Sequence, residues 1–243
     1  MHLLIDNSNT RTKFALDQNG VLSDWRATIP TQDLSAPTLE EALEDQELTH
    51  LTLCSVVPKA AELMGAHFDL PIHQISHRSN LPISIDYPRP EKIGADRLAN
   101  ASAAVLEGAH PAIVIDFGTA VTFDVISEQS SYLGGVIAPG TASLRDYLHK
   151  KTALLPAIQL EEPETAIGRS TAEAMQIGAV VGYRGLVREI LSAICAELGG
   201  NPTIMATGGD AALIGQGLPE IGKIDPDLTM KGILAIGRSN HRL

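Results

Sequence analysis

The 243-residue chain is acidic, with 29 aspartates and glutamates against 18 lysines and arginines, a formal net charge of -11 and only 4% aromatic residues. Such a chain repels a phosphate backbone and offers few rings on which bases can stack, so we expect no nucleic-acid partner. Its apolar runs are too short to span a membrane, and Asp6 and Asn7 interrupt the N-terminal one, so we expect no signal peptide, no membrane partner and a cytoplasmic location.

The first predicted element is a short buried strand that ends in a polar turn. Residues 3–5 form an apolar run that is too short for a helix. Asp6 follows it, and small or hydroxyl-bearing residues then continue to Lys13. A second strand starting at Lys13, a turn at 18–20 and a third strand over 21–28 complete a predicted three-strand meander.

The next stretch alternates predicted helices and short strands around a proline-rich arm. We expect strands at 51–57 and 72–75, and helices at about 39–45, 59–67 and 96–107. Three prolines make 81–90 an ordered extended arm rather than a helix or strand. Gly108 and Pro111 mark a boundary, so we expect one domain over 1–110 and a second over 111–243.

The second domain begins as the first one does. Residues 113–115 form another apolar run, Asp116 ends it, and small residues follow at 118–120. Further strands are predicted over 122–126 and 132–137. Two copies of one strand-and-turn unit imply two similar α/β domains, each a mixed sheet flanked by helices, that face each other across a cleft.

The rest of the chain is mostly helical in pattern. We expect helices at about 142–150, 171–198, 210–215 and 229–236, a strand at 203–207 and a sharp turn at Gly208 and Gly209. The longest of these helices contains Gly178, Gly182 and Gly185, and each glycine costs about 1 kcal/mol of helix propensity. We expect another backbone to approach the helix closely at these glycines, either in the sheet or in a partner subunit.

An aspartate at a strand end, followed by small residues, suits the binding of phosphate with a divalent cation. Backbone N–H groups and hydroxyls would cradle phosphate oxygens, while Asp6 would hold Mg²⁺ directly or through water. Lys13 adds a positive charge that would neutralise a β- or γ-phosphate. Each aspartate could instead start a turn through its own side chain, but its occurrence in two equivalent places favours phosphate binding.

The segment from Gly94 to Arg97, directly before a predicted helix, is a second candidate site. Asp96 is a favoured helix N-cap, but it also suits a general base that takes a proton from an alcohol. Arg97 would pair with an anionic group of the substrate, and Tyr87 in the upstream arm would form a wall of the same pocket. Both interpretations of Asp96 stay open at this level.

Three further clusters carry weaker signals. Paired glycines in 134–140 permit close approach of a backbone or ligand, and 168–171 offers either an anion site or an ordinary N-cap. The turn over 207–210 could run alongside a bound nucleotide.

The chain has no P-loop, no nucleophile elbow and no zinc-type spacing of histidine and cysteine, which excludes P-loop kinases, α/β-hydrolases and zinc sites.

Taken in order, these motifs resemble those of the type III pantothenate kinases, members of the acetate/sugar kinase–Hsp70–actin superfamily. The family pattern DxGNTxxK corresponds to residues 6–13, GxDR to 94–97, DxGTAxTxD to 116–124 and GGxIxPG to 134–140. The ordered set spans nearly the whole chain, which makes it far more specific than any single motif.

The resemblance implies two duplicated ribonuclease H-like (actin-like ATPase) domains with the active site in the cleft between them. It implies ATP-dependent phosphorylation of pantothenate to 4'-phosphopantothenate, the first step of coenzyme A biosynthesis, by a homodimer that needs Mg²⁺ and a monovalent cation, K⁺ or NH₄⁺. Asp96 would be the general base, and Asp116 would bind K⁺. ATP would contact Asp6, Asn7, Ser8, Asn9, Thr10, Arg11, Thr12, Lys13 and Thr119. Pantothenate would contact Tyr87, Gly94, Ala95, Asp96, Arg97 and Thr171.

Ser8 departs from the family pattern, which usually has glycine at this position. If the turn needs a positive φ or very close approach of a phosphate, Ser8 would cost about 1 kcal/mol or more and weaken nucleotide binding. In an allowed conformation, Ser8 would instead offer its hydroxyl to a phosphate.

Two other functions stay open at the level of sequence. Another kinase or phosphatase of the same superfamily would share the fold, and the arm with Tyr87 and the motif over 94–97 would discriminate it. A non-catalytic regulator is the second alternative, because some relatives are described as transcriptional activators. A regulator would tolerate the loss of Asp6, Asp96 or Asp116, yet all three are present.

Overall fold

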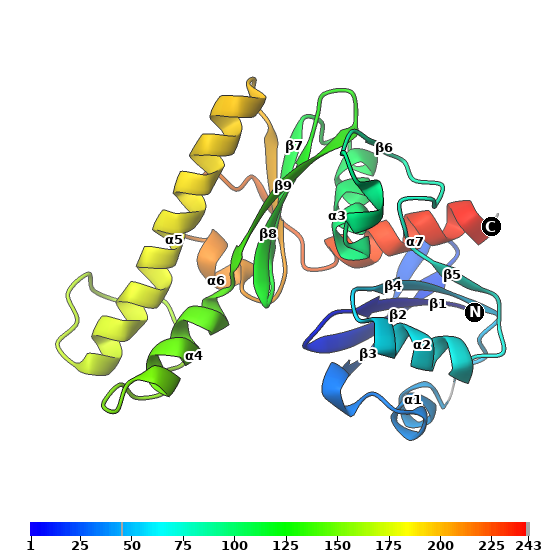
Figure 1. The fold of residues 1–243 in the computed structure, drawn as a ribbon, viewed down its shortest axis with the longest axis horizontal. Helices are drawn as coiled ribbons and strands as arrows, with labels where there is room; N and C mark the ends of the chain where they lie inside the picture. The colour runs from blue at the N-terminus through cyan, green and yellow to red at the C-terminus, as the bar shows by residue number, and fades with distance from the viewer. Residues whose placement is uncertain (45, 242–243) are drawn as a thin grey trace. The chain divides into compact units, whose positions relative to one another are not determined.

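The computed structural model describes residues 1–44 and 46–241, without the side chains of residues 144 and 145 (Figure 1). The chain forms two compact units. Unit 1 comprises Met1–Ala109, Ser130–Leu133 and the C-terminal segment from Asp227, and unit 2 comprises His110–Gln129 and Gly134–Pro226. The predicted α/β class with two mixed sheets is confirmed. The domains predicted over 1–110 and 111–243 differ from these units at His110, at residues 130–133 and over the stretch from Asp227.

The sheet of unit 1 is built around β1 (His2–Asn7), which is buried along its whole length. β1 pairs antiparallel with β2 (Arg11–Gln18) and parallel with β4 (His50–Ser55). β3 (Val21–Pro30) and β5 (Ile72–Gln74) add the two edges, which gives the order β3-β2-β1-β4-β5. The predicted N-terminal meander is therefore confirmed.

Two helices of unit 1, α1 (Ala36–Leu43) and α2 (Pro58–His67), pack their apolar faces on this sheet. Ser35 and Thr38 form a capping box that fixes the start of α1, and each helix has a proline in its first turn. Because of this cap, α1 begins earlier than the predicted helix at 39–45. Asp45, the predicted end of that helix, lies outside the described residues.

The proline-rich arm contains a short strand that the sequence pattern concealed. β6 (Ser84–Ile85) pairs in parallel with Ser131 and Tyr132, the first residues of β9 (Ser131–Pro139). This pairing is the reason that residues 130–133 belong to unit 1.

α7 (Leu228–His241) packs against α3 (Ala95–Leu106) and β1 in unit 1. Gly232 makes this contact possible, because a Cβ at that position would lie 1.9 Å from the carbonyl oxygen of Ala99. The Thr229 hydroxyl also donates a hydrogen bond to Asn100 Oδ1 at 2.8 Å. The helix predicted at 229–236 therefore exists, but it completes unit 1, because its glycine fits the backbone of α3.

Three histidines meet where the end of α7 lies on the sheet of unit 1. The His2 and His50 rings stack with centroids 4.3 Å apart, and the centroid of His241 lies 4.7 Å from that of His50. Burial lowers the pKa of His2 to about 4, so its ring is neutral at neutral pH. Burial alone would raise the pKa of Asp17, but a backbone N–H and the Arg238 guanidinium, 2.8 Å away, lower it. Ring contacts with His241 and the ion pair between Arg238 and Asp17 thus contribute to the packing of α7 on the sheet.

In unit 2, β7 (Ala112–Phe117) takes the place that β1 has in unit 1. It pairs antiparallel with β8 (Ala120–Ile126) and parallel with β10 (Thr203–Thr207). With β11 (Lys223–Ile224) on one side and β9 followed by β6 on the other, the order is β11-β10-β7-β8-β9-β6. Both units thus share a central strand, an antiparallel hairpin partner and a parallel partner, which confirms the predicted duplication.

α5 (Thr171–Leu198) covers one face of the unit 2 sheet (Figure 1). The apolar residues that it buries there include Val180, Tyr183, Val187 and Leu191. α4 (Thr141–Lys151) contacts α5, and α6 (Ala211–Gly215) follows β10. In the described part of the chain, no helix is long and apolar enough to cross a membrane.

The glycines of α5 face open space. Around Gly178, Gly182 and Gly185, no described atom outside the local helix backbone lies within 4 Å of where a Cβ would be. The expected close approach by the sheet is therefore wrong. The alternative, close approach by a partner subunit, stays a prediction.

Candidate functional site

The first predicted phosphate site is the turn between β1 and β2. Asp6 lies near the end of β1, opposite Lys13 of β2, with Lys13 Nζ 3.7 Å from Asp6 Oδ2. The Asp6 side chain is 10% exposed and that of Lys13 is 45% exposed. A nearly buried carboxylate beside a partly exposed ammonium group suits a cation and a phosphate bound at one place.

Ser8 closes this turn without strain. Both its backbone N–H and its hydroxyl donate to the carbonyl oxygen of Arg11, each at 3.0 Å. Among the described residues, the non-glycine positions with positive φ are Asn19 and Ser130, so Ser8 has an allowed conformation. The condition of a positive φ at position 8 is therefore not met, and the alternative of an allowed conformation is confirmed. A cost from very close approach of a phosphate stays a prediction.

The motif over 6–13 has an accessible tip and a buried base. Asn9, Thr10 and Arg11 are exposed. Asn7 and Thr12 are 1% and 0% exposed, and Asn7 Nδ2 donates a hydrogen bond to Thr12 Oγ1 at 2.8 Å. The tip can meet a ligand directly, whereas these two side chains support the turn from within the unit.

Asp96 lies in the first turn of α3, which begins at Ala95 and has Gly94 as its N-cap. The interpretation of Asp96 as the N-cap is therefore wrong. A Cβ at position 94 would lie 2.5 Å from Asp96 Oδ1, so glycine there makes room for the carboxylate. Burial raises the pKa of Asp96 above its usual range, and a hydrogen bond from the Arg97 N–H, 2.8 Å away, opposes the rise in part. A raised pKa suits a carboxylate that has to accept a proton.

Tyr87 and Arg97 converge on Tyr132, which is completely buried at the start of β9. The Tyr87 and Tyr132 rings meet edge to face with centroids 6.3 Å apart. The guanidinium carbon of Arg97 lies 5.7 Å from the centroid of the Tyr132 ring, a cation–π contact that orients the arginine. The structure thus brings the arm and the start of α3 together in unit 1, as the sequence predicts.

In unit 2, two glycines pack against the turn between β7 and β8. A Cβ at Gly140 would lie 2.4 Å from the carbonyl oxygen of Gly118 and 2.5 Å from that of Thr119. A Cβ at Gly208, where φ is +96°, would lie 2.5 Å from Asp116 Oδ1. Motifs that are far apart in the second half of the sequence therefore meet at this one turn.

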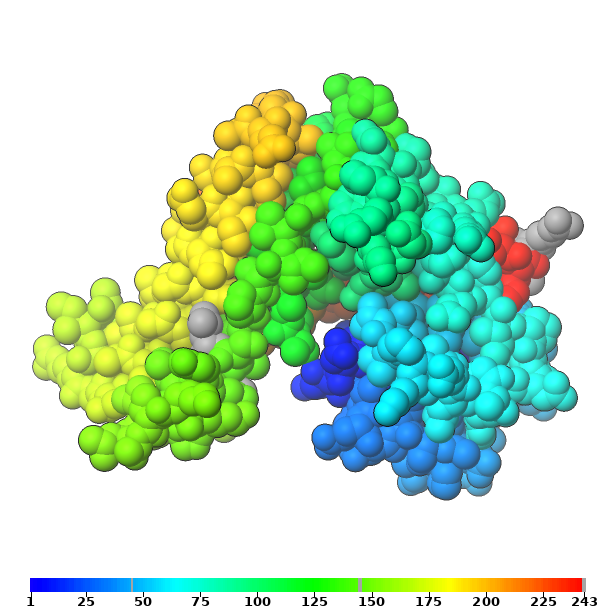
Figure 2. Space-filling model, in the orientation of Figure 1, coloured from blue at the N-terminus to red at the C-terminus, as the bar shows by residue number. Residues whose placement is uncertain are grey.

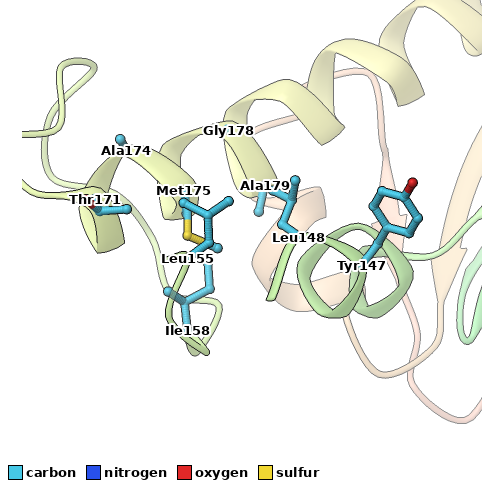
Figure 3. Close-up of a pocket in the computed structure, with 9 residues that line it drawn as sticks. All are labelled: Tyr147, Leu148, Leu155, Ile158, Thr171, Ala174, Met175, Gly178 and Ala179. Carbon is cyan, nitrogen blue, oxygen red and sulfur yellow. The ribbon is translucent and has the colours of Figure 1, made fainter. Parts of the chain in front are cut away.

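Thr171 is the first residue of α5, and Ser170 is its N-cap, accepting a hydrogen bond from the Glu173 N–H at 3.2 Å. The capping interpretation is thus confirmed for Ser170. Thr171 lines a pocket of about 510 Å³ whose walls are otherwise largely apolar (Figure 3). Leu148 of α4 and Met175 of α5 are among its lining residues. An anion-binding role for the start of α5 stays a prediction.

No group of three or more histidine, cysteine, aspartate or glutamate side chains that could hold a metal ion occurs within residues 1–44 and 46–241. Asp6 lies near the end of β1 in unit 1, and Asp116 lies near the end of β7 in unit 2. This arrangement fits Mg²⁺, which binds through one or two carboxylates together with substrate phosphates and water.

Comparison with known proteins decides the family. The family model described as type III pantothenate kinase matches residues 2–193. The type III pantothenate kinase of Akkermansia muciniphila is 53% identical over 232 residues, which cover 96% of this chain and 96% of the relative. This chain belongs to the type III pantothenate kinase family.

Solved structures support the fold of this pantothenate kinase family member. A Campylobacter jejuni protein described as a Baf family transcriptional activator matches with a TM-score of 0.66 and 21% identity, covering 99% of this chain and 100% of that one. A Sinorhizobium meliloti protein described as a 2-dehydro-3-deoxygalactonokinase matches with a TM-score of 0.64 and 15% identity, covering 100% of both chains. At these identities the likeness shows the kinase–actin fold alone.

Membership of the type III pantothenate kinases makes the chain a phosphotransferase that uses ATP to phosphorylate pantothenate in coenzyme A biosynthesis. This identification sets aside the two alternatives, another enzyme of the superfamily and a non-catalytic regulator. The protein described as an activator shares only 21% of its residues with this chain, far fewer than the kinase relative.

Sequence reasoning overlooks three residues beside the motifs of this kinase family member. The sequence around Tyr132 indicates only the start of a strand. The contact of Tyr132 with the arm depends on the pairing of β6 with β9, which the sequence does not show. Thr31 directly follows β3, and Ser55 is the last residue of β4; both contact the first turn from within unit 1. The sequence signal for all three is only a polar residue at a strand end.

Proposed function

We propose that Asp96 is the general base for phosphorylation of the primary hydroxyl of pantothenate. Its carboxylate takes the hydroxyl proton as that oxygen bonds to the γ-phosphorus of ATP, and the bond from the γ-phosphorus to the bridging oxygen of ADP breaks. The observation that carries the proposal is the position of Asp96 in the first turn of α3, where burial raises its pKa.

The pantothenate site is proposed to include the residues around Asp96. The Arg97 guanidinium pairs with the pantothenate carboxylate, and Tyr87 forms one wall. Gly94 and Ala95 contribute backbone at the start of the helix. Thr171 contributes its hydroxyl to the same substrate from the start of α5.

The ATP site is proposed to include both repeated turns. Backbone N–H groups of Asn9 and Thr10 meet phosphate oxygens, while Ser8 closes the turn through the Arg11 carbonyl. The side chains of Arg11 and Lys13 neutralise the phosphate charge. The buried side chains of Asn7 and Thr12 contribute indirectly, by fixing the conformation of the turn. The Asp6 carboxylate faces the phosphates from the base of the turn. Thr119, at the equivalent turn of unit 2, contacts ATP as well.

Two cations are proposed to complete the site. Asp6 holds Mg²⁺ directly or through water, and Asp116 holds K⁺ or NH₄⁺. Bound cations supply positive charge that stabilises the transferred phosphoryl group, in addition to that of Arg11, Lys13 and Arg97, in a protein whose net charge is -11.

Measurement of ADP release tests the cation requirement. With ATP, Mg²⁺ and pantothenate, we expect steady turnover in K⁺ or NH₄⁺ and only background turnover in Na⁺, because the smaller ion fits the Asp116 site poorly. Equal turnover in Na⁺ would contradict the monovalent site. Absence of pantothenate-dependent turnover in every cation would contradict the kinase itself.

The chain is also proposed to act as a homodimer through the exposed face of α5. Gly178 and Gly182 are four residues apart, as are Val181 and Gly185, so the four lie on one side of the helix, and all four are exposed. Exposed apolar side chains also occur on α4 and within residues 152–170. These segments lie beside α5 and are coloured green and yellow-green in Figure 2. Small residues in such a stripe allow a second helix to approach closely, which explains glycines that no contact within the chain requires.

Replacement of Val181 by glutamate tests the dimer. We expect the wild-type protein to have the mass of a dimer by size-exclusion chromatography with light scattering, and Val181→Glu to have that of a monomer, because burial of an unpaired charge is unfavourable. Val21→Glu, the same change at an exposed valine of β3, serves as the control and should leave the dimer intact. A dimeric Val181→Glu variant would contradict this interface.

A further inference from the structure

A chain of hydrogen bonds runs beneath the turn over residues 6–13. Ser55 Oγ donates to Asn7 Oδ1 at 2.6 Å, and Asn7 Nδ2 donates to Thr12 Oγ1 at 2.8 Å. Thr12 Oγ1 lies 3.1 Å from Thr31 Oγ1, and the Thr31 hydroxyl donates to the carbonyl oxygen of Ser8 at 2.7 Å. The chain therefore joins the end of β4, the base of the turn and the start of a 3₁₀ turn, η1 (Thr31–Asp33).

The number of hydroxyl protons determines which threonine donates in this chain of hydrogen bonds. Thr31 has one hydroxyl proton, and it is committed to the carbonyl oxygen of Ser8. In the contact between the two threonines, Thr12 must therefore be the donor and Thr31 the acceptor. Thr12 in turn accepts a hydrogen bond from Asn7. Each of the two threonine hydroxyls therefore donates one hydrogen bond, and neither hydroxyl proton is left without an acceptor. Loss of the Thr31 hydroxyl would leave both Thr12 and the Ser8 carbonyl without this partner.

Thr31 also determines which way the turn presents its amides. A trans peptide unit holds its C=O and the following N–H on opposite sides of a plane. Because Thr31 draws the Ser8 carbonyl oxygen inward, the N–H of Asn9 in the same peptide unit points outward. The backbone N–H of Thr31 holds the carbonyl oxygen of Thr10 in the same way, at 3.0 Å, which turns the N–H of Arg11 away from Thr31.

We propose that Thr31 is a positioning residue for ATP, acting through the carbonyl of Ser8 to aim backbone amides at phosphate oxygens, with Ser55 supporting the far end of the same chain. The proposal rests on the proposed function, because it requires the turn over 6–13 to bind ATP. Neither residue belongs to a motif of the sequence.

The test compares Thr31→Val, which removes the hydroxyl at nearly constant volume, with Thr31→Ser, which keeps it. We expect Thr31→Val to raise the KM for ATP and the Kd for ADP about tenfold, with the KM for pantothenate unchanged. Thr31→Ser should stay within about twofold of the wild type. Ser55→Ala should raise the same ATP constants by a smaller factor, because Ser55 lies three hydrogen bonds further from the Ser8 carbonyl than Thr31 does.

Thr49→Val is the matched control. The Thr49 hydroxyl also donates to a backbone carbonyl oxygen, that of Met1 at 3.3 Å, but it lies at the opposite end of β1. Thermal unfolding separates positioning from stability: a purely structural role lowers the Tm and leaves the KM for ATP of the folded variant unchanged, which would overturn the proposal.

The outcomes separate this proposal from the proposed function. Wild-type turnover combined with an unchanged KM for ATP in both Thr31→Val and Ser55→Ala would overturn the positioning role alone. A folded wild-type protein that neither binds ADP nor turns over would overturn both proposals together. Should Thr31→Val fail to fold, the ATP constants of Ser55→Ala and Thr31→Ser still decide the matter.

Discussion

Replacement of Asp96 by asparagine is expected to lower kcat by about 10²- to 10⁴-fold, because a carboxamide cannot take the proton of the attacking hydroxyl. The change is nearly isosteric, so α3 and the contact of Arg97 with Tyr132 should be retained. The KM for ATP should change little, since the turn over 6–13 is intact. Steady-state kinetics of ADP release with each substrate varied in turn measures all three constants.

The pH profile gives a second readout of Asp96. Because burial raises the pKa of this carboxylate, wild-type kcat/KM should fall as the pH decreases through a value above that of an ordinary aspartate. The residual activity of Asp96→Asn should lack this acid limb. Asp69→Asn, the same change on an exposed carboxylate, is the matched control and should behave as wild type. Full activity in Asp96→Asn would contradict the assignment of the base.

Replacement of Gly232 by alanine is expected to destabilise the protein by about 3 kcal/mol, at the upper end of the range for overpacked contacts. The new Cβ would lie 1.9 Å from the carbonyl oxygen of Ala99 and 2.5 Å from its carbonyl carbon. Both are backbone atoms of α3, so α3 and α7 have to move apart. A loss of this size corresponds to a fall in Tm of about 6–12 °C for a chain of this length.

Gly65→Ala provides the matched control for this substitution. Gly65 lies in α2, and no described atom outside the local helix backbone is within 4 Å of where its Cβ would be. There the change should raise stability by about 0.5–1 kcal/mol, because alanine is the better helix former. Since α3 carries Asp96 in its first turn, Gly232→Ala should also reduce kcat in the fraction that stays folded. An unchanged Tm for Gly232→Ala would contradict the close packing of the two helices.

Much of the fold could be predicted because each central strand is an apolar run that ends in aspartate. Residues 3–5 and 113–115 are buried in the middle of their sheets, and burial on both faces produces such runs. The placement of α7 could not be predicted in this way. Its sequence indicates a helix, but only the fit of Gly232 against Ala99 shows that the helix completes unit 1.

The site was predictable where chemistry depends on residue type and order, and less so where it depends on packing. The sequence places Asp6, Asp96 and Asp116 in motifs, yet it cannot show that Asn7 and Thr12 are buried beneath the turn. Nor does it show whether position 8 needs a positive φ, since that depends on how the turn closes. In the structure Ser8 closes it through the carbonyl of Arg11, with no strain.

The most direct test of the central claim is identification of the phosphorylated product by ³¹P NMR. Wild-type protein with ATP, Mg²⁺, K⁺ and pantothenate should yield a phosphomonoester resonance split by two methylene protons, as phosphate on the primary hydroxyl requires, in equal amount to ADP. Asp96→Asn should form this product at least about a hundred times more slowly. ADP accompanied only by inorganic phosphate, or equal rates from the two proteins, would contradict the account.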